Sequence, residues 1–307
     1  GNAGANTLWG TVTLAANGFA GIGGDGANGA TNPVTGVGGA GGNGGNSGQG
    51  NGGSISLVAS GGTISLGELQ ANANGVGQFG AVGGSGGAGA VPPNSPPMTP
   101  AGSNGAAGAF GNSGVGIGGS VELSALTDEG GAIGGLTLGD TFIDVTGTMR
   151  FFDVSVPSVG GTVSIIDRVD DSNGGVRFGS LGINAGGDIT FEPASVTIES
   201  SDGPIVVDGN LSIAAAGDVN ILTFGTGGLD VGGFIEIDTQ GTVQIDDDFC
   251  TESECPTEPT ISADGSISIF ATGGNVLLIG ASTLASGANI LIDAGGSITG
   301  GPGSGYR

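Results

Sequence analysis

The densest group of metal-ligating side chains in this sequence surrounds a pair of cysteines. Three carboxylates precede the first cysteine and two more lie between the cysteines: Asp246, Asp247, Asp248, Glu252 and Glu254. Hard oxygen ligands at this density suit Ca²⁺. Most acidic loops are simply solvated, so the segment predicts either a calcium site or a solvated acidic loop.

Cys250 and Cys255 are the only two cysteines in the chain. A zinc site would need two more soft ligands, and the chain has no histidine and no other cysteine. The spacing therefore favours a disulfide that closes a small loop, which implies an oxidising compartment. A second, weaker calcium pattern is the single Gly-Gly-x-Gly-x-Asp-like copy at Gly23–Asn28, which ends in asparagine.

Catalytic chemistry has few candidates. Without histidine or lysine, the chain lacks the usual general base and the amine nucleophile, and a Ser-His-Asp arrangement is impossible. Two carboxylates would suffice for a glycosidase. No pair is singled out, however, and Trp9 and Tyr306 are the only tryptophan and tyrosine. We expect a protein that is not an enzyme.

The net charge of −24 comes from 28 carboxylates against four arginines. Nucleic acids and anionic lipids need a basic footprint, so neither is an expected partner. No run of apolar residues is long enough to predict a transmembrane helix. The chain begins at Gly1, so we expect a mature or cut piece whose targeting segment lies upstream.

The elements that would carry these groups come from one short phrase, repeated about a dozen times: glycine, a small or polar residue, an aliphatic, any residue, and a second aliphatic. Three copies begin 24 residues apart, at Gly217, Gly241 and Gly265, and a second series begins at Gly209 and Gly233. In each phrase the two aliphatics share one face of a short strand. A fixed period indicates a repeat architecture.

This pattern predicts an all-β fold, a three-sided parallel β-helix (β-solenoid) with one strand on each side of every coil. A β-sandwich is the alternative, but its hairpins usually carry Asn-Gly or Asp-Gly turns. We expect a single solenoid over 1–307, with its more regular part at 120–300.

Two glycine-rich insertions, 18–53 and 75–119, interrupt the strand phrases. A Gly/Ser tract is commonly a flexible linker. Glycine at every third position, as in residues 105–114, instead suits a three-residue helix packed backbone to backbone, a polyglycine II bundle. Both alternatives are open, and an ordered bundle would bring the two insertions together.

The repeated phrase and the glycine-rich insertions together resemble the filamentous haemagglutinin type of secreted bacterial exoprotein. The phrases that carry the resemblance lie around Gly53–Leu57, Leu181–Thr190 and Gly295–Thr299. The resemblance implies a right-handed β-helix, export from a Gram-negative cell, and a role in adhesion or in the extracellular (biofilm) matrix.

The strand pattern runs nearly to both ends, and no polar capping element is visible. Uncapped solenoids can add copies of themselves. We expect an extracellular structural protein, the subunit of a head-to-tail surface filament or matrix fibre, whose subunit joint uses residues near the two ends: Thr11, Val12, Thr13, Leu14, Ile290, Ile292 and Ile298. The alternative is an adhesin segment that binds a host or glycan receptor.

Overall fold

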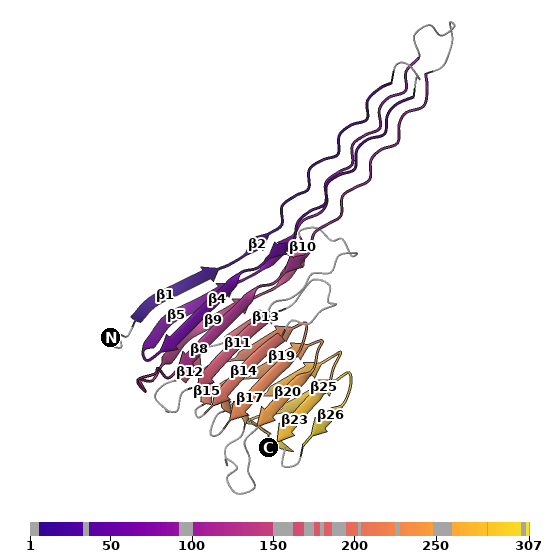
Figure 1. Cartoon of the computed structure of the whole chain (residues 1–307). Coiled ribbons are helices and arrows are strands. Elements are labelled where there is room, and N and C mark those ends of the chain that lie inside the picture. Colours follow the sequence, from indigo (N-terminus) through magenta and orange to yellow (C-terminus); the bar gives the residue numbers. More distant parts are fainter. Residues whose placement is uncertain are drawn as a thin grey trace.

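The glycine-led phrases fold into short parallel strands that stack along one axis (Figure 1). The computed structural model describes residues 6–32, 37–91, 101–149, 162–168, 175–178, 181–185, 195–201, 204–224, 228–247, 260–280, 282–301 and 305–306. Among these residues, no helix has the length and hydropathy needed to cross a lipid bilayer. The all-β parallel β-helix expected from the sequence is confirmed.

Face 1 of the solenoid is an eight-stranded parallel sheet. Along the axis its strands are β4 (Ser54–Ser60), β8 (Ser120–Leu126), β11 (Thr162–Arg168), β14 (Ser195–Ser201), β17 (Val219–Phe224), β20 (Val243–Asp247), β23 (Val276–Gly280) and β26 (Ile298–Gly300).

Faces 2 and 3 begin as three long strands that bend across both faces. They are β1 (Asn6–Ala15), β5 (Thr63–Asn72) and β9 (Gly135–Asp144). A glycine column, Gly10, Gly67 and Gly139, lies at the bend. A Cβ on Gly139 would stand 1.5 Å from the Gly67 carbonyl oxygen, so only glycine fits this approach.

After β9 each coil has two separate strands on these faces. On face 2 they are β12 (Gly175–Phe178), β15 (Pro204–Val207), β18 (Gly228–Val231), β21 (Ile261–Ala263), β24 (Thr283–Ser286) and β27 (Gly305–Tyr306). On face 3 they are β13 (Leu181–Ala185), β16 (Leu211–Ala215), β19 (Ile235–Thr239), β22 (Ile267–Ala271) and β25 (Ile290–Ala294). The first half of β9 pairs with β12 and its second half with β13.

The registers correct one interpretation of the repeat. Val219 pairs with Val243, so Gly217 and Gly241 do lead neighbouring strands of face 1. The phrase at Gly265 leads β22, which pairs with β19 on face 3 and not with β20. Its 24-residue distance from Gly241 is a coincidence, because this coil is longer: Val243 pairs with Val276, 33 residues on.

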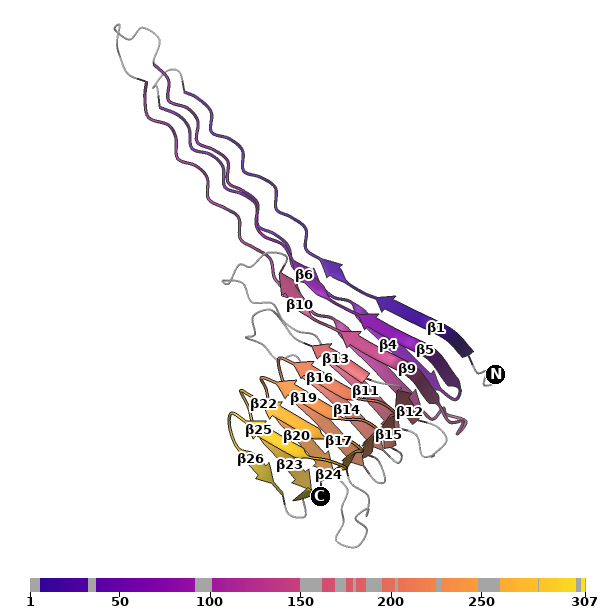
Figure 2. The same cartoon turned by 180° about the vertical axis from the view of Figure 1, so that it is seen from behind.

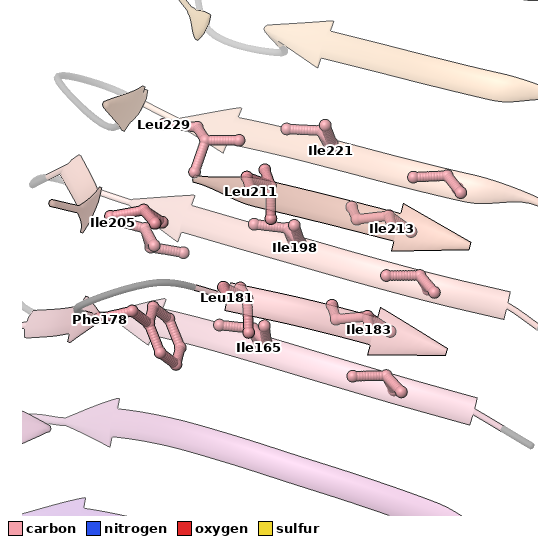
Figure 3. Close-up of a cluster of buried hydrophobic side chains, with 14 of the residues drawn as sticks. Ile165, Phe178, Leu181, Ile183, Ile198, Ile205, Leu211, Ile213, Ile221 and Leu229 are labelled. Carbon is pink, nitrogen blue, oxygen red and sulfur yellow. The ribbon is translucent and has the colours of Figure 1, made fainter. Parts of the chain in front are cut away.

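The core is a narrow column of mostly aliphatic side chains, with the ring of Phe178 among them, between the three faces; Figure 3 shows part of it. Face 1 contributes one continuous inward column: Ile55, Val121, Val163, Val196, Val219, Val243, Val276 and Ile298. All of these side chains except Ile298 are buried. Each coil therefore covers the next, as the short strands require.

We expect Ile245→Ala to lower the free energy of unfolding by about 2–5 kcal/mol, the usual cost of emptying a buried aliphatic site. Ile245 is 0% exposed and is paired with Ile221 and Leu278 on either side. Denaturant unfolding followed by circular dichroism measures the change. Leu291→Ala, at a side chain that is 52% exposed, is the matched control and should stay within about 0.5 kcal/mol of the unchanged chain. Equal effects of the two changes would contradict the assigned core.

Candidate assembly interface

The N-terminal end of the solenoid presents free strand edges. Within the described residues, β1 pairs only with β5, and β4 pairs only with β8. Val12, Leu14 and Ala16 contact the core but stay half-buried, because no coil of the described part of the chain covers them. The alternating Thr11 and Thr13 are exposed. The end is thus an aliphatic row beside an unpaired backbone edge.

The C-terminal end mirrors this arrangement. In the described part of the chain, β25 pairs only with β22, and β26 pairs only with β23. Ile290, Ile292 and Ala294 are half-buried against the core, and Ile298 is 52% exposed. The seven residues expected at a subunit joint therefore lie at the two free ends of the stack. Their role in a joint remains a prediction.

The inward columns begin and end with compatible side chains. On face 3 one column starts at Val12 and ends at Ile290, and the next starts at Leu14 and ends at Ile292. On face 1 a column starts at Ile55 and ends at Ile298. If one copy were stacked on another, each column would continue with an aliphatic pair.

Side-chain oxygens at the start of several strands bridge neighbouring coils. Asn210 Oδ1 accepts a hydrogen bond from the Phe234 backbone N–H at 3.1 Å, and Asn275 Oδ1 accepts one from Ser297 N–H at 2.8 Å. Asn289 precedes β25 as Asn210 precedes β16, and it is exposed. Within the described residues its side-chain amide has no partner, so it is free to accept a bond from an added coil.

Glu68 helps to hold β1 on β5. The Thr11 hydroxyl donates to Glu68 Oε2 at 2.5 Å, and the Gln70 amide donates to Glu68 Oε1 at 3.2 Å. These two hydrogen bonds favour the charged form and lower the pKa of Glu68. The carboxylate is therefore ionised at neutral pH and can accept both hydrogen bonds.

Four glycine-rich arms leave the corner between faces 3 and 1 and run side by side away from the solenoid (Figures 1 and 2). We number them by residue range as arm 1 (20–32), arm 2 (37–49), arm 3 (78–91) and arm 4 (101–115). Five short strands form their base: β2 (Gly18–Phe19), β3 (Gly50–Asn51), β6 (Gly75–Gly77), β7 (Gly116–Ile117) and β10 (Gly147–Met149).

Backbone hydrogen bonds join the arms at every third residue. At one level Gly42 N–H donates to Ala27 O at 2.7 Å, Gly84 N–H to Gly42 O at 2.7 Å, and Gly108 N–H to Gly84 O at 2.8 Å. The same set recurs three residues along, at Gly39, Gly87 and Gly105. This is the three-residue period of a polyglycine II bundle. The described arm residues therefore follow the ordered alternative, and the two insertions lie together.

The number of glycines per triplet follows the number of neighbouring arms. Arms 2 and 3 each bond to three arms and carry paired glycines, such as Gly41–Gly42 and Gly83–Gly84. Arm 4 bonds to two arms and keeps one glycine per triplet, as at Gly105 and Gly108. A Cβ on Gly84 would lie 2.0 Å from Ala27 O, whereas one on Gly24 would meet nothing within 4 Å.

Large apolar side chains project from the arms, a feature that the sequence reasoning missed. On the arms they are Phe110 at 74% exposure, Ile22 at 67%, Val82 at 55%, Val91 at 50%, Val37 at 46% and Phe79 at 43%; Phe19, at 70%, lies in β2 at the base of the arms. Their signal was present in the sequence as isolated apolar residues at non-glycine positions of the triplets. These residues can be recognised as outward-facing only once the positions that face the neighbouring arms are known to be glycine.

The predicted acidic and cysteine site is only partly described. Asp246 and Asp247 lie at the end of β20, where Asp247 is buried and Asp246 Oδ2 accepts from Gln244 Nε2 at 3.4 Å. Asp248, Cys250, Glu252, Glu254 and Cys255 lie outside the described residues. No group of three metal-ligating side chains gathers within the described part of the chain. Calcium binding and the disulfide stay predictions.

The weaker calcium pattern on arm 1 has a structural use. Asn28 Oδ1 accepts hydrogen bonds from Ser85 N–H at 3.0 Å and from the Ser85 hydroxyl at 2.9 Å. Its oxygen thus ties arm 1 to arm 3. Asp25, three residues before it, is exposed.

The described fold agrees with the solenoid that the resemblance to filamentous haemagglutinins implies. The adhesive function that the same resemblance implies stays a prediction. Comparison of the chain with protein-family models, with curated proteins and with solved structures gave no match.

Proposed function

We propose that this chain is a structural protein that polymerises head to tail into an extracellular filament or matrix fibre. The observation that supports the proposal most is the match between the two ends. Within the described residues both ends present free parallel edges. The column that begins at Val12 ends at Ile290, and the column that begins at Leu14 ends at Ile292, so the half-buried side chains of the two ends have the same register. Stacking would cover apolar surface and pair the free edges at once.

The contact is heterologous, because the first coil of one subunit meets the last coil of the next. A heterologous contact that does not close into a ring generates a filament. The arms leave one side of the solenoid (Figure 1), so each subunit would add one bundle to the outside of the filament. In this proposal the chain has no catalytic role and lies outside a Gram-negative cell.

The experiment is negative-stain electron microscopy of the purified 307-residue chain at neutral pH, with and without Ca²⁺. Long filaments of uniform width are the expected result. A calcium requirement would add support for the acidic segment as a cation site. Single short rods under both conditions would contradict the proposal.

Assembly is expected to accelerate with ionic strength. Every subunit carries a net charge of −24, so two approaching subunits repel each other. Salt shortens the range of this repulsion from about 30 Å at 0.01 M to about 8 Å at 0.15 M. Light scattering should show faster growth in 0.15 M than in 0.01 M NaCl. CaCl₂ at matched ionic strength separates charge screening from specific cation binding. A growth rate that does not change with NaCl concentration would contradict the electrostatic argument.

A second candidate function is the adhesin segment, which the exposed apolar side chains of the arms favour. Phe110 lies on arm 4 and Phe19 lies in β2 at the base of the arms, and neither belongs to the solenoid core. Exposed aromatic side chains on a projecting rod suit contact with a receptor, because aromatic rings contribute large contact areas at interfaces. A chain that stays monomeric, binds cell surfaces or immobilised glycans, and loses that binding in Phe110→Ser would favour this function over the filament.

A further inference from the structure

The three faces of the solenoid do not contain equal numbers of strands. Among the described residues, face 1 has eight strands, β4 to β26. Face 3 also has eight, from the second half of β1 to β25. Face 2 has nine, because it begins with the first half of β1 and ends with the additional strand β27.

This inequality fixes how a second copy can stack. One strand level is the spacing between neighbouring strands of a face along the solenoid axis. If the next subunit is placed eight strand levels along the axis, its β4 pairs with β26 and the second half of its β1 pairs with β25. Faces 1 and 3 then continue without a gap. On face 2, however, Asn6–Leu8 of the incoming copy needs the edge of β24, and β27 already occupies that edge.

A step of nine levels would avoid the overlap but leave two gaps. Face 3 would lack a partner for the five residues of β25, and face 1 would lack one for the three residues of β26. Unpaired backbone groups enclosed between two coils are costly. The eight-level step leaves only one surplus strand of two residues.

We propose, on the basis of the head-to-tail assembly proposed above, that β27 is a temporary cover of the growing end. It protects the β24 edge in the free subunit and is displaced by Asn6–Leu8 of the next subunit. The partner is thus a second copy of this chain, and the register of the joint is set by strand number.

The exchange favours the incoming strand. β27 makes two ladder pairs with β24, Thr283–Gly305 and Leu284–Tyr306. Asn6–Leu8 offers three positions, as it does to Ile64–Leu66 of its own β5. It also continues directly into Thr11–Ala15, so docking of that half on β25 holds it beside β24 at a high effective concentration.

The first test is a chain shortened by residues 305–307, which removes β27. Its critical concentration for polymerisation, measured by sedimentation of filaments, is expected to fall about tenfold, because one or two net hydrogen bonds no longer have to be broken. Circular dichroism checks that the shortened chain is folded.

The second test locks β27 in place with the variant Thr283→Cys, Gly305→Cys. These residues are ladder partners. Neighbouring strands lie about 4.8 Å apart, within the Cα–Cα range of a disulfide. The oxidised variant should fail to elongate, and the same protein after reduction should grow. The unchanged chain treated with the same oxidant and reductant, and Thr283→Cys alone, are the controls.

The outcomes separate this inference from the proposed function. If the full chain polymerises and neither the deletion nor the disulfide alters growth, the proposal that β27 covers the growing end is wrong, and the proposal of a head-to-tail filament is still supported. If the deletion abolishes growth, β27 is part of the joint and the cover is also wrong. If neither the full nor the shortened chain polymerises, both proposals are overturned.

Discussion

Leu14→Asp and Ile292→Asp are each expected to stop polymerisation, and an equimolar mixture of the two variants should form dimers only. Each variant loses one end of the solenoid and keeps the other. The intact C-terminal end of Leu14→Asp can join the intact N-terminal end of Ile292→Asp. Both outer ends of the resulting dimer carry a substitution and cannot add another subunit. Analytical ultracentrifugation of the single variants and of the mixture measures this directly.

The expected size of the effect comes from burying a carboxylate between aliphatic columns. Leu14 and Ile292 are the end members of one inward column. An aspartate there would have to be protonated to be buried, which costs about 4 kcal/mol at pH 7 and weakens the joint roughly a thousandfold.

Matched controls place the same charge on the outward side of the same strands. Thr13 and Leu291 are exposed neighbours of the two joint residues. Thr13→Asp and Leu291→Asp should therefore still polymerise. Filaments formed by Leu14→Asp alone, or larger assemblies in the mixture, would contradict a head-to-tail joint at these ends.

Gly84→Ala is expected to disrupt the arm bundle, while Gly24→Ala leaves it unchanged. A Cβ at Gly84 would lie 2.0 Å from Ala27 O, which is a backbone atom and cannot rotate away, so arms 1 and 3 must separate. At Gly24 the same methyl group meets nothing within 4 Å. Both changes restrict the unfolded chain equally, so their difference isolates the packing.

Amide hydrogen exchange measures this prediction. The N–H groups of Gly26, Gly84 and Gly108 bond across the arms and should exchange slowly in the unchanged chain. In Gly84→Ala they should exchange at least tenfold faster, whereas the strands of face 1 keep their protection. If Gly24→Ala and Gly84→Ala behave alike, glycine is not selected by close packing of the arms.

The sequence was informative wherever a period maps directly onto geometry. Alternate aliphatics predicted the strands, and glycine at every third residue gave the period of an ordered bundle but left a flexible linker as an open alternative. The phrase beginning at Gly10 did not reveal that β1 starts at Asn6 and covers two faces, because the bend at Gly10 divides one strand into two halves.

Pairing across long distances could not be derived from spacing alone. Gly265 had the expected distance from Gly241 but belongs to another face, because a longer coil shifts the phase. Which coils are neighbours also determines the partners of the arms and, within the described residues, the additional strand β27 on face 2 and the unpaired side-chain amide of Asn289. Strand number per face, which sets the proposed register, is visible only in the folded chain.

Electron cryo-microscopy of the filaments tests the central claim most directly, through the axial distance between successive subunits. Eight strand levels at about 4.8 Å predict an axial rise of about 38 Å, with one arm bundle projecting at each step. A rise of about 43 Å would indicate nine levels and contradict the displacement of β27. Filaments whose subunits alternate in direction, or an absence of filaments, would contradict head-to-tail stacking itself.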